Sequence, residues 1–281
     1  MKSRFPVKTG IFSIVVFGWF YSSPLYCQNT FEAELMKKID SLSITLENWE
    51  LFPNDAPQGV TIPSGWGGYG TYLFGFIGAS YPEVYHTNEG DLIASAGFCV
   101  GNPVKAVNFA ASLNIENVSE FQSYSGNFIL SRKIFKGSSI SIGGLQLFTN
   151  KKSDAPIPTF YIAFSHSIQT MPSKTPGCSK LTYTIGIGNG RFVLKSPKDV
   201  EAGKGKYGTA VFGGISYELF RRVNLNAEWT GMNLAMSLGL RPFKKISLSF
   251  GIGATDLTRY TSDKPSAVFF VGYPLSLNRK N

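Results

Sequence analysis

The sequence has few charged residues for its length and no long apolar run. Lys, Arg, Asp and Glu make up 16% of the 281 residues, whereas soluble domains usually carry about 25%. The longest apolar run, residues 11–21, has 11 residues, which is too short for the ~20 that a membrane-spanning helix needs. The sequence therefore excludes a helical membrane protein and argues against an ordinary soluble domain.

The N-terminus has the organisation of a secretory signal peptide. Lys2, Arg4 and Lys8 precede the apolar run, and a polar stretch leads to Cys27, so we predict cleavage near residue 27. Tyr26 fits poorly before a lipidated cysteine, which argues against a lipoprotein. Removal of three positive charges from a net charge of +9 leaves +6 in the mature chain. Export permits disulfides, but the predicted separation of Cys99 and Cys178 argues against a bond between them.

Strict alternation of apolar and polar residues is the strongest pattern in the chain. Leu234, Met236, Leu238 and Leu240, for example, alternate with Asn233, Ala235, Ser237 and Gly239. Period two indicates β-strands with one apolar face. The other face carries Ser, Gly, Asn and Thr in place of the Lys and Glu of a solvent-exposed face. Such a combination is typical of a barrel with lipid outside and a confined polar lumen.

The alternation predicts twelve strands in one antiparallel transmembrane β-barrel, an all-β fold, within residues 70–281. Each strand is near the ~9–11 residues that a tilted spanning strand needs. Connections after even-numbered strands are mostly short and those after odd-numbered strands mostly long, as expected for periplasmic turns and external loops. The predicted strands are 70–80, 91–101, 104–116, 124–134, 138–149, 158–168, 179–189, 207–220, 223–231, 232–241, 246–256 and 265–277.

Residues 28–69 separate the signal peptide from the barrel. Apolar residues at three-to-four spacing predict a helix up to about residue 50. Pro and Gly then predict a linker over 51–69. The helix has three alternative places: inside the lumen, flat on the periplasmic leaflet, or against a partner. Its apolar stripe slightly favours the periplasmic surface.

With these features, residues 70–277 resemble the bacterial outer-membrane β-barrel proteins. The resemblance implies location in the outer membrane of a Gram-negative bacterium, contact with lipid and lipopolysaccharide, and folding by the barrel-assembly machinery. The class also includes the outer-membrane phospholipases, so the resemblance raises the question of an enzyme. These phospholipases carry a catalytic His and Ser two residues apart on one strand. Here His166 is followed directly by Ser167, and adjacent strand residues point to opposite faces. We therefore predict that the protein is not an enzyme, and expect no cofactor, metal or nucleic-acid partner.

Two groups of charged residues are candidate functional residues. Four lie on the predicted inner face, where they would either set the field of a pore or pair across a closed lumen: Lys105, Glu218, Glu228 and Arg241. Five form a basic external loop that would attract anions or lipopolysaccharide phosphates, or simply be solvated: Arg191, Lys195, Lys198, Lys204 and Lys206.

Two functional hypotheses follow. The first is a passive channel for small solutes with a mild preference for anions. The second is a closed barrel that docks an envelope protein through its loops or its N-terminal helix. Small inner-face residues favour an open pore, whereas four large residues would favour closure if they point inward: Tyr161, Phe212, Val268 and Phe270.

Overall fold

The computed structural model describes residues 49–82, 91–115, 118, 123–149, 158–244, 246–261 and 264–277. The predicted signal peptide and nearly all of the predicted N-terminal helix lie outside the described residues. No helix in the part of the chain that is described is long and apolar enough to cross a membrane.

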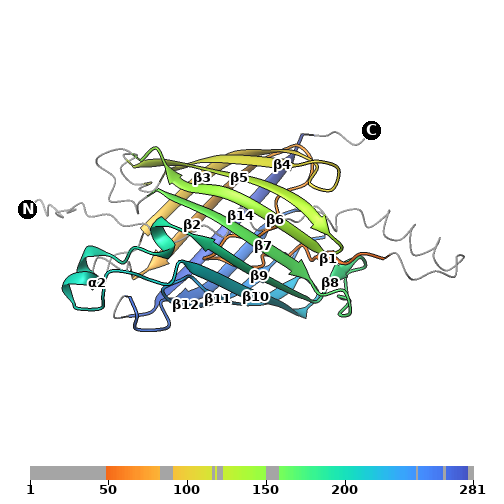
Figure 1. The fold of residues 1–281 in the computed structure, drawn as a ribbon. Coiled ribbons are helices and arrows are strands. Elements are labelled where there is room, and N and C mark those ends of the chain that lie inside the picture. The colour runs from red at the N-terminus through yellow and green to blue at the C-terminus, as the bar shows by residue number, and fades with distance from the viewer. Residues whose placement is uncertain are drawn as a thin grey trace, which may run out of the picture.

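Twelve strands form a closed antiparallel barrel, as the alternation predicts (Figure 1). In chain order they are β2 (Tyr72–Tyr81), β3 (Asp91–Gly101), β4 (Asn108–Ile115), β5 (Tyr124–Phe135), β6 (Ser138–Leu147), β7 (Thr159–Ser167), β9 (Leu181–Gly188), β10 (Val211–Phe220), β11 (Val223–Trp229), β12 (Leu234–Leu240), β13 (Ser249–Thr255) and β14 (Ser266–Ser276). Pairing of β14 with β2 closes the barrel, with Val271 opposite Ile77.

One short two-stranded sheet lies outside the barrel wall. The two-residue strand β1 (Phe52–Pro53) pairs in parallel with β8 (Cys178–Ser179). We call the end that holds β1, β8 and the turn at residues 136–137 the turn end. The opposite end, with the 3₁₀ helix η3 (Gly190–Phe192) and helix α2 (Pro197–Glu201), is the loop end (Figure 1).

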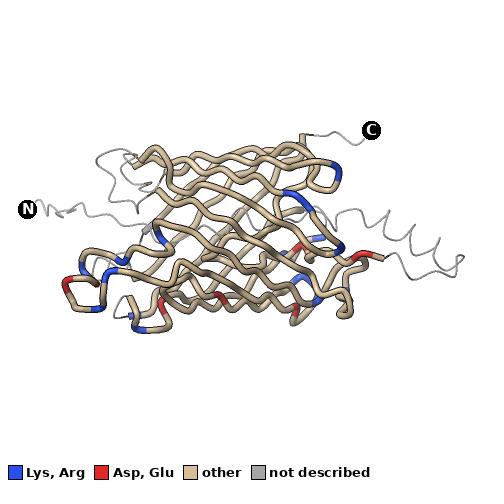
Figure 2. The backbone as a smooth tube through the Cα atoms, in the orientation of Figure 1, with Lys and Arg blue, Asp and Glu red and all other residues tan. Residues whose placement is uncertain are grey.

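The two faces of the wall have the chemistry that the sequence predicts. Figure 2 shows that charged residues gather at the two ends and are few along the wall. Exposed apolar side chains cover the outside of the strands: Leu73, Ile77, Phe98, Leu113, Ile142, Ile162, Ile185, Ile215, Met236, Ile252 and Phe269. Buried small polar side chains line the inside: Ser80, Ser95, Asn114, Asn127, Ser141, Ser165, Thr182, Ser216, Asn226, Ser237 and Ser266.

The apolar outer face makes a direct test possible at Ile185, which is exposed in the middle of β9. Ile185→Arg places a charge against lipid, so we expect the free energy of unfolding in phospholipid vesicles to fall by about 2–4 kcal/mol. Urea titration of vesicle-bound protein measures the change, and Ile185→Leu should stay close to wild type. Equal stability of the two variants would contradict a lipid-facing role for this surface.

Candidate functional site

The lumen contains part of the chain itself, residues 51–68, which we call the luminal segment. All of its residues are buried except Phe52 and Gln58, which are partly buried. The segment begins at the turn end, where Leu51 exchanges two hydrogen bonds with the Gln169 side chain. Glu50 precedes it and forms an ion pair with Lys133. From the sequence we predict a linker here and do not place it inside the barrel.

Two polar contacts hold the first part of the segment to the wall near the turn end. The side chains of Asn54 and Asn224 are hydrogen-bonded at 2.8 Å. The Asp55 carboxylate lies 3.3 Å from Nη1 of Arg241, and both side chains are buried. Because Asn224 lies in the turn-end part of β11 and Arg241 directly follows β12, the segment is still near that end here.

The inner turn of the segment closes around Glu228. Its carboxylate oxygens accept hydrogen bonds from the backbone N–H groups of Val60, Thr61 and Ile62, at 2.9–3.3 Å. Successive N–H groups that point at one anion form a strong binding nest. Gly59 is required for this approach, because a Cβ there would lie 2.4 Å from Oε1 of Glu228.

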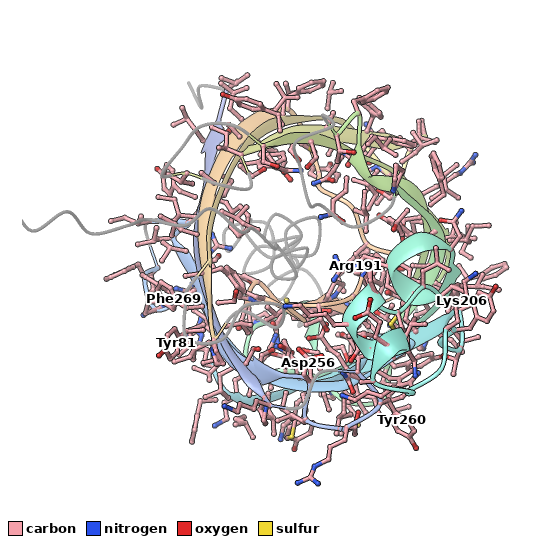
Figure 3. All side chains as sticks on the ribbon, turned by 90° about the vertical axis from the view of Figure 1, so that its left-hand side faces the viewer. Tyr81, Arg191, Lys206, Asp256, Tyr260 and Phe269 are labelled. Atoms are coloured by element: carbon pink, nitrogen blue, oxygen red, sulfur yellow. The ribbon has the colours of Figure 1, made fainter. Side chains whose placement is uncertain are left out.

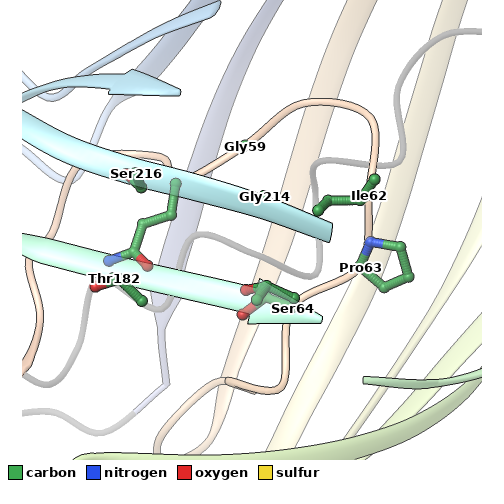
Figure 4. Close-up of a pocket in the computed structure, with 9 residues that line it drawn as sticks. Gly59, Ile62, Pro63, Ser64, Thr182, Gly214 and Ser216 are labelled. Carbon is green, nitrogen blue, oxygen red and sulfur yellow. The ribbon is translucent and has the colours of Figure 1, made fainter. Parts of the chain in front are cut away.

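The second part of the segment returns to the turn end. Figure 4 shows the arch from Gly59 to Ser64 beside the wall strands that carry Gly214 and Thr182. Ser141 donates a hydrogen bond to the Ser64 carbonyl at 2.7 Å, and Gly65 N–H donates to Ser165 Oγ at 2.8 Å. The cavity beside the arch has a water-accessible volume of about 10 Å³, about the size of one water molecule.

Large side chains narrow the lumen further. The four residues that distinguish an open from a closed barrel all prove to be buried: Tyr161, Phe212, Val268 and Phe270. Phe192, which is in η3 at the loop end, stacks on Phe212 with ring centroids 4.4 Å apart. Phe270 packs edge-on against Phe76 inside the wall. Aromatic rings and the luminal segment therefore both occupy the interior.

Three of the four charged residues predicted to face the lumen are buried, and each has a partner. Glu228 and Arg241 contact the luminal segment, and Glu218 accepts a hydrogen bond from Lys174 N–H at 3.2 Å. The prediction that Lys105 faces the lumen is wrong, because this residue is exposed in the turn before β4. The Asn102 side chain accepts hydrogen bonds from the N–H groups of Val104 and Lys105. This Asx turn delays the start of β4 to Asn108.

The predicted basic loop lies at the loop end and is folded, with η3 and α2 inside it. All five predicted residues belong to it: Arg191, Lys195, Lys198, Lys204 and Lys206. Lys204 is 3.4 Å from Asp199, and Lys195 donates to the carbonyls of Lys204 and Tyr260. Figure 3 looks into this end, where Arg191 and Asp256 lie on the lumen side and Tyr81 and Phe269 face outward. Burial raises the pKa of the Asp256 carboxyl, against opposing hydrogen bonds from Asn233, Thr255 and Thr261.

His166 has a serine partner other than the adjacent Ser167. Its Nδ1 lies 2.7 Å from Oγ of Ser138, which is opposite it on β6. Among the described residues, His166 forms no ion pair with a carboxylate that would orient it as in a catalytic triad. Cys99 carries a free thiol, so it is not bonded to Cys178, as the sequence predicts. No three potential metal-ligating side chains gather within the described ranges.

The closed wall of twelve antiparallel strands, the apolar exterior and the polar interior together define the class. The chain has the architecture of a bacterial outer-membrane β-barrel.

Solved structures of this class are similar to the chain at low identity. Outer membrane phospholipase A from Escherichia coli is 13% identical, with 74% of this chain and 90% of that chain covered and a TM-score of 0.38. The KdgM porin in complex with disordered oligogalacturonate is 10% identical, with 74% and 99% covered and a TM-score of 0.41. The Salmonella typhi phospholipase dimer with bound calcium is 11% identical, with 74% and 91% covered and a TM-score of 0.37. No family model and no curated protein matches the sequence.

The close packing of the wall on the luminal segment gives a testable prediction at Gly239. A Cβ there would lie 2.0 Å from the Pro57 carbonyl oxygen. We therefore expect Gly239→Ala to displace the segment and to increase protease cleavage within residues 51–68 at least about tenfold, since this backbone contact leaves no room for a methyl group.

Gly75→Ala is the matched control, because a Cβ at Gly75 has no neighbour closer than 4.0 Å. Limited proteolysis of the refolded variants, read by mass spectrometry, measures the effect. Identical cleavage patterns for the two variants would show that residues 51–68 do not pack on β12.

Proposed function

We propose that the protein is an outer-membrane barrel held closed by its own luminal segment, and that solutes pass only when this segment moves. The observation that carries the proposal is the carboxylate of Glu228, which binds three successive backbone N–H groups of the segment inside the barrel. The sequence predicts a passive channel, and the present proposal specifies that this channel is closed at rest.

The energetics of Glu228 favour the closed state. Hydrogen bonds to a charged group contribute about 1.5–3 kcal/mol each, although the three share one carboxylate and do not add fully. Withdrawal of the segment also separates Asp55 from Arg241 and Asn54 from Asn224. Because a difference of about 1.4 kcal/mol changes a population tenfold, these contacts together keep the open state rare.

The net charge of the protein and the position of its basic loop support a proposal about which solutes it prefers. The net charge of +6 in the predicted mature chain and the basic loop at the loop end support a mild preference for anions. We also propose that the protein is exported by a cleaved signal peptide and is folded by the barrel-assembly machinery. In the outer membrane it would contact lipid and lipopolysaccharide.

The second candidate is a closed barrel that binds an envelope protein. The folded loop end favours it, because α2 is capped by the Ser196 side chain and Tyr207 and Tyr260 are exposed beside it. Ordered loops on a rigid barrel are suited to recognition. Conductance distinguishes the two candidates.

In single-channel recordings in planar bilayers, we expect the refolded protein to be in the non-conducting state almost all the time. In Glu228→Gln the amide nitrogen would face backbone N–H groups, so the closed state is weakened and the open fraction should rise at least about tenfold. Glu201→Gln, an exposed change on α2, is the control and should match wild type.

Steady conductance by the wild type would contradict closure by the luminal segment. Silence of wild type, Glu228→Gln and a deletion of residues 51–68, each checked for folding by circular dichroism, would favour the interaction barrel.

A further inference from the structure

Two arginines meet at the turn end of the lumen, just beyond β11 and β12. The N–H of Arg241 donates to the carbonyl of Arg222 at 3.0 Å. The neighbouring pair, Val223 and Leu240, is in register. Arg222 lies in the turn, and its guanidinium interacts electrostatically with that of Arg241, which is buried.

The positive charge of this group exceeds the negative charge beside it. Asp55 of the luminal segment lies 3.3 Å from Arg241, and Arg222 and Arg221 also act on its charge. Glu218, on the neighbouring strand β10, directs one carboxylate oxygen to Lys174 N–H. Figure 2 shows basic and acidic residues close together at this end. Arg241 pairs with Asp55 directly, whereas Arg222 and Arg221 interact with that carboxylate only electrostatically.

Arg222 has donors that the protein leaves unused. Its Nε and Nη1 are buried and donate no hydrogen bond to any described residue. Oδ1 of Asp55 is likewise buried without a donor in the described chain. Buried donors of a charged group are costly when unpaired. The protein therefore presents ready donors and excess positive charge at one place.

We propose that Arg222 and Arg241 form a binding site for a small oxyanion, a carboxylate or phosphate group, at the turn end of the lumen. Planar guanidinium groups match the oxygens of these anions better than they match a halide. Asp55 already occupies one side of Arg241 as a carboxylate of the chain itself, which shows that the position accepts this chemistry.

The site would couple ligand binding to the luminal segment, and this step alone rests on the proposed function. An oxyanion on Arg241 competes with Asp55 for the same guanidinium. Binding thereby weakens one of the contacts that hold the segment near the turn end. The ligand is thus an anionic solute that favours opening as it binds.

Calorimetry of the full chain in nanodiscs tests the site. Inorganic phosphate and succinate are titrated separately, at an ionic strength held constant with NaCl. We expect saturable binding of at least one of them, and the two titrations distinguish phosphate from carboxylate recognition. Arg222→Gln should weaken binding at least about tenfold through the loss of charge-assisted hydrogen bonds, and Arg222→Lys should restore little of it because the planar donors are lost.

Three controls separate a site from a diffuse field. Arg221→Gln removes an equal charge from an exposed residue of the same turn, and Lys105→Gln removes one from another exposed turn; both should bind nearly as wild type. Asp55→Asn removes the competitor and should tighten binding.

The proposal fails if no saturable binding occurs, if Arg221→Gln weakens binding as much as Arg222→Gln, or if Asp55→Asn weakens it. The last result would mean that Asp55 does not compete with the anion for Arg241. Binding is read without conductance, so a barrel that proves constitutively open would overturn the proposed function and leave this test intact.

Discussion

Pairing of β14 with β2 is the constraint on which the rest of the structure depends. In lipid, each strand must find backbone partners on both sides, so the sheet has to close and leave no edge. The ladder from Ala267 opposite Tyr81 to Ser276 opposite Tyr72 provides that closure. Since β2 follows directly on the luminal segment, the segment is tied to the first closing strand. Its return to the turn end, where Gly70 N–H donates to the Gly101 carbonyl, therefore positions both the closing strand and the lumen contents.

Closure also decides what fills the interior. The wall directs Ser, Asn and Thr inward, and these side chains pair with one another in part, as Asn114 does with Ser95 and Ser125. Buried polar groups without partners are costly. The luminal segment supplies backbone donors and acceptors for polar groups of the wall, such as Ser141 and Glu228. A segment rich in Pro and Gly suits this role, because it forms no sheet of its own and its backbone approaches closely.

Much of the barrel could be predicted from the sequence, because alternation is a local pattern that each strand repeats. The twelve predicted strands agree with the observed ones to within a few residues at most ends. The start of β4 differs because the Asx turn at Asn102 outweighs the apolar pattern near Val104. The inward placement of Glu228 and Arg241 followed from the same parity. Their partners could not be predicted in this way, since Val60, for example, is 168 residues from Glu228 along the chain.

The luminal segment was missed for a related reason, because Pro and Gly carry no periodicity and composition alone suggests a linker. Two signals were nevertheless present. Val60, Ile62 and Trp66 are apolar residues that a solvated linker rarely needs, and all three are buried here. Glu228 also lay on an inner face with very few charges, where an unpaired carboxylate is costly. A charge on such a face implies a partner within the lumen, and the Pro- and Gly-rich stretch was the part of the sequence without an assigned place.

The distribution of contacts along the luminal segment indicates how it would move. Contacts near the turn end include an additional β-pairing, β1 with β8, an amide pair and an ion pair. The inner turn is bound by Glu228 and by the packing of Val60 and Ile62 in buried apolar clusters. The returning part is hydrogen-bonded to Ser141 and Ser165. Because the polar contacts of the inner turn all depend on one carboxylate, we expect the segment to open first at the inner turn, with the turn-end contacts kept. Release of Asp55 from Arg241 would weaken the more firmly held end, while the β1–β8 pairing and the Asn54–Asn224 pair remain. The two contacts thus act on different parts of the segment within one barrel.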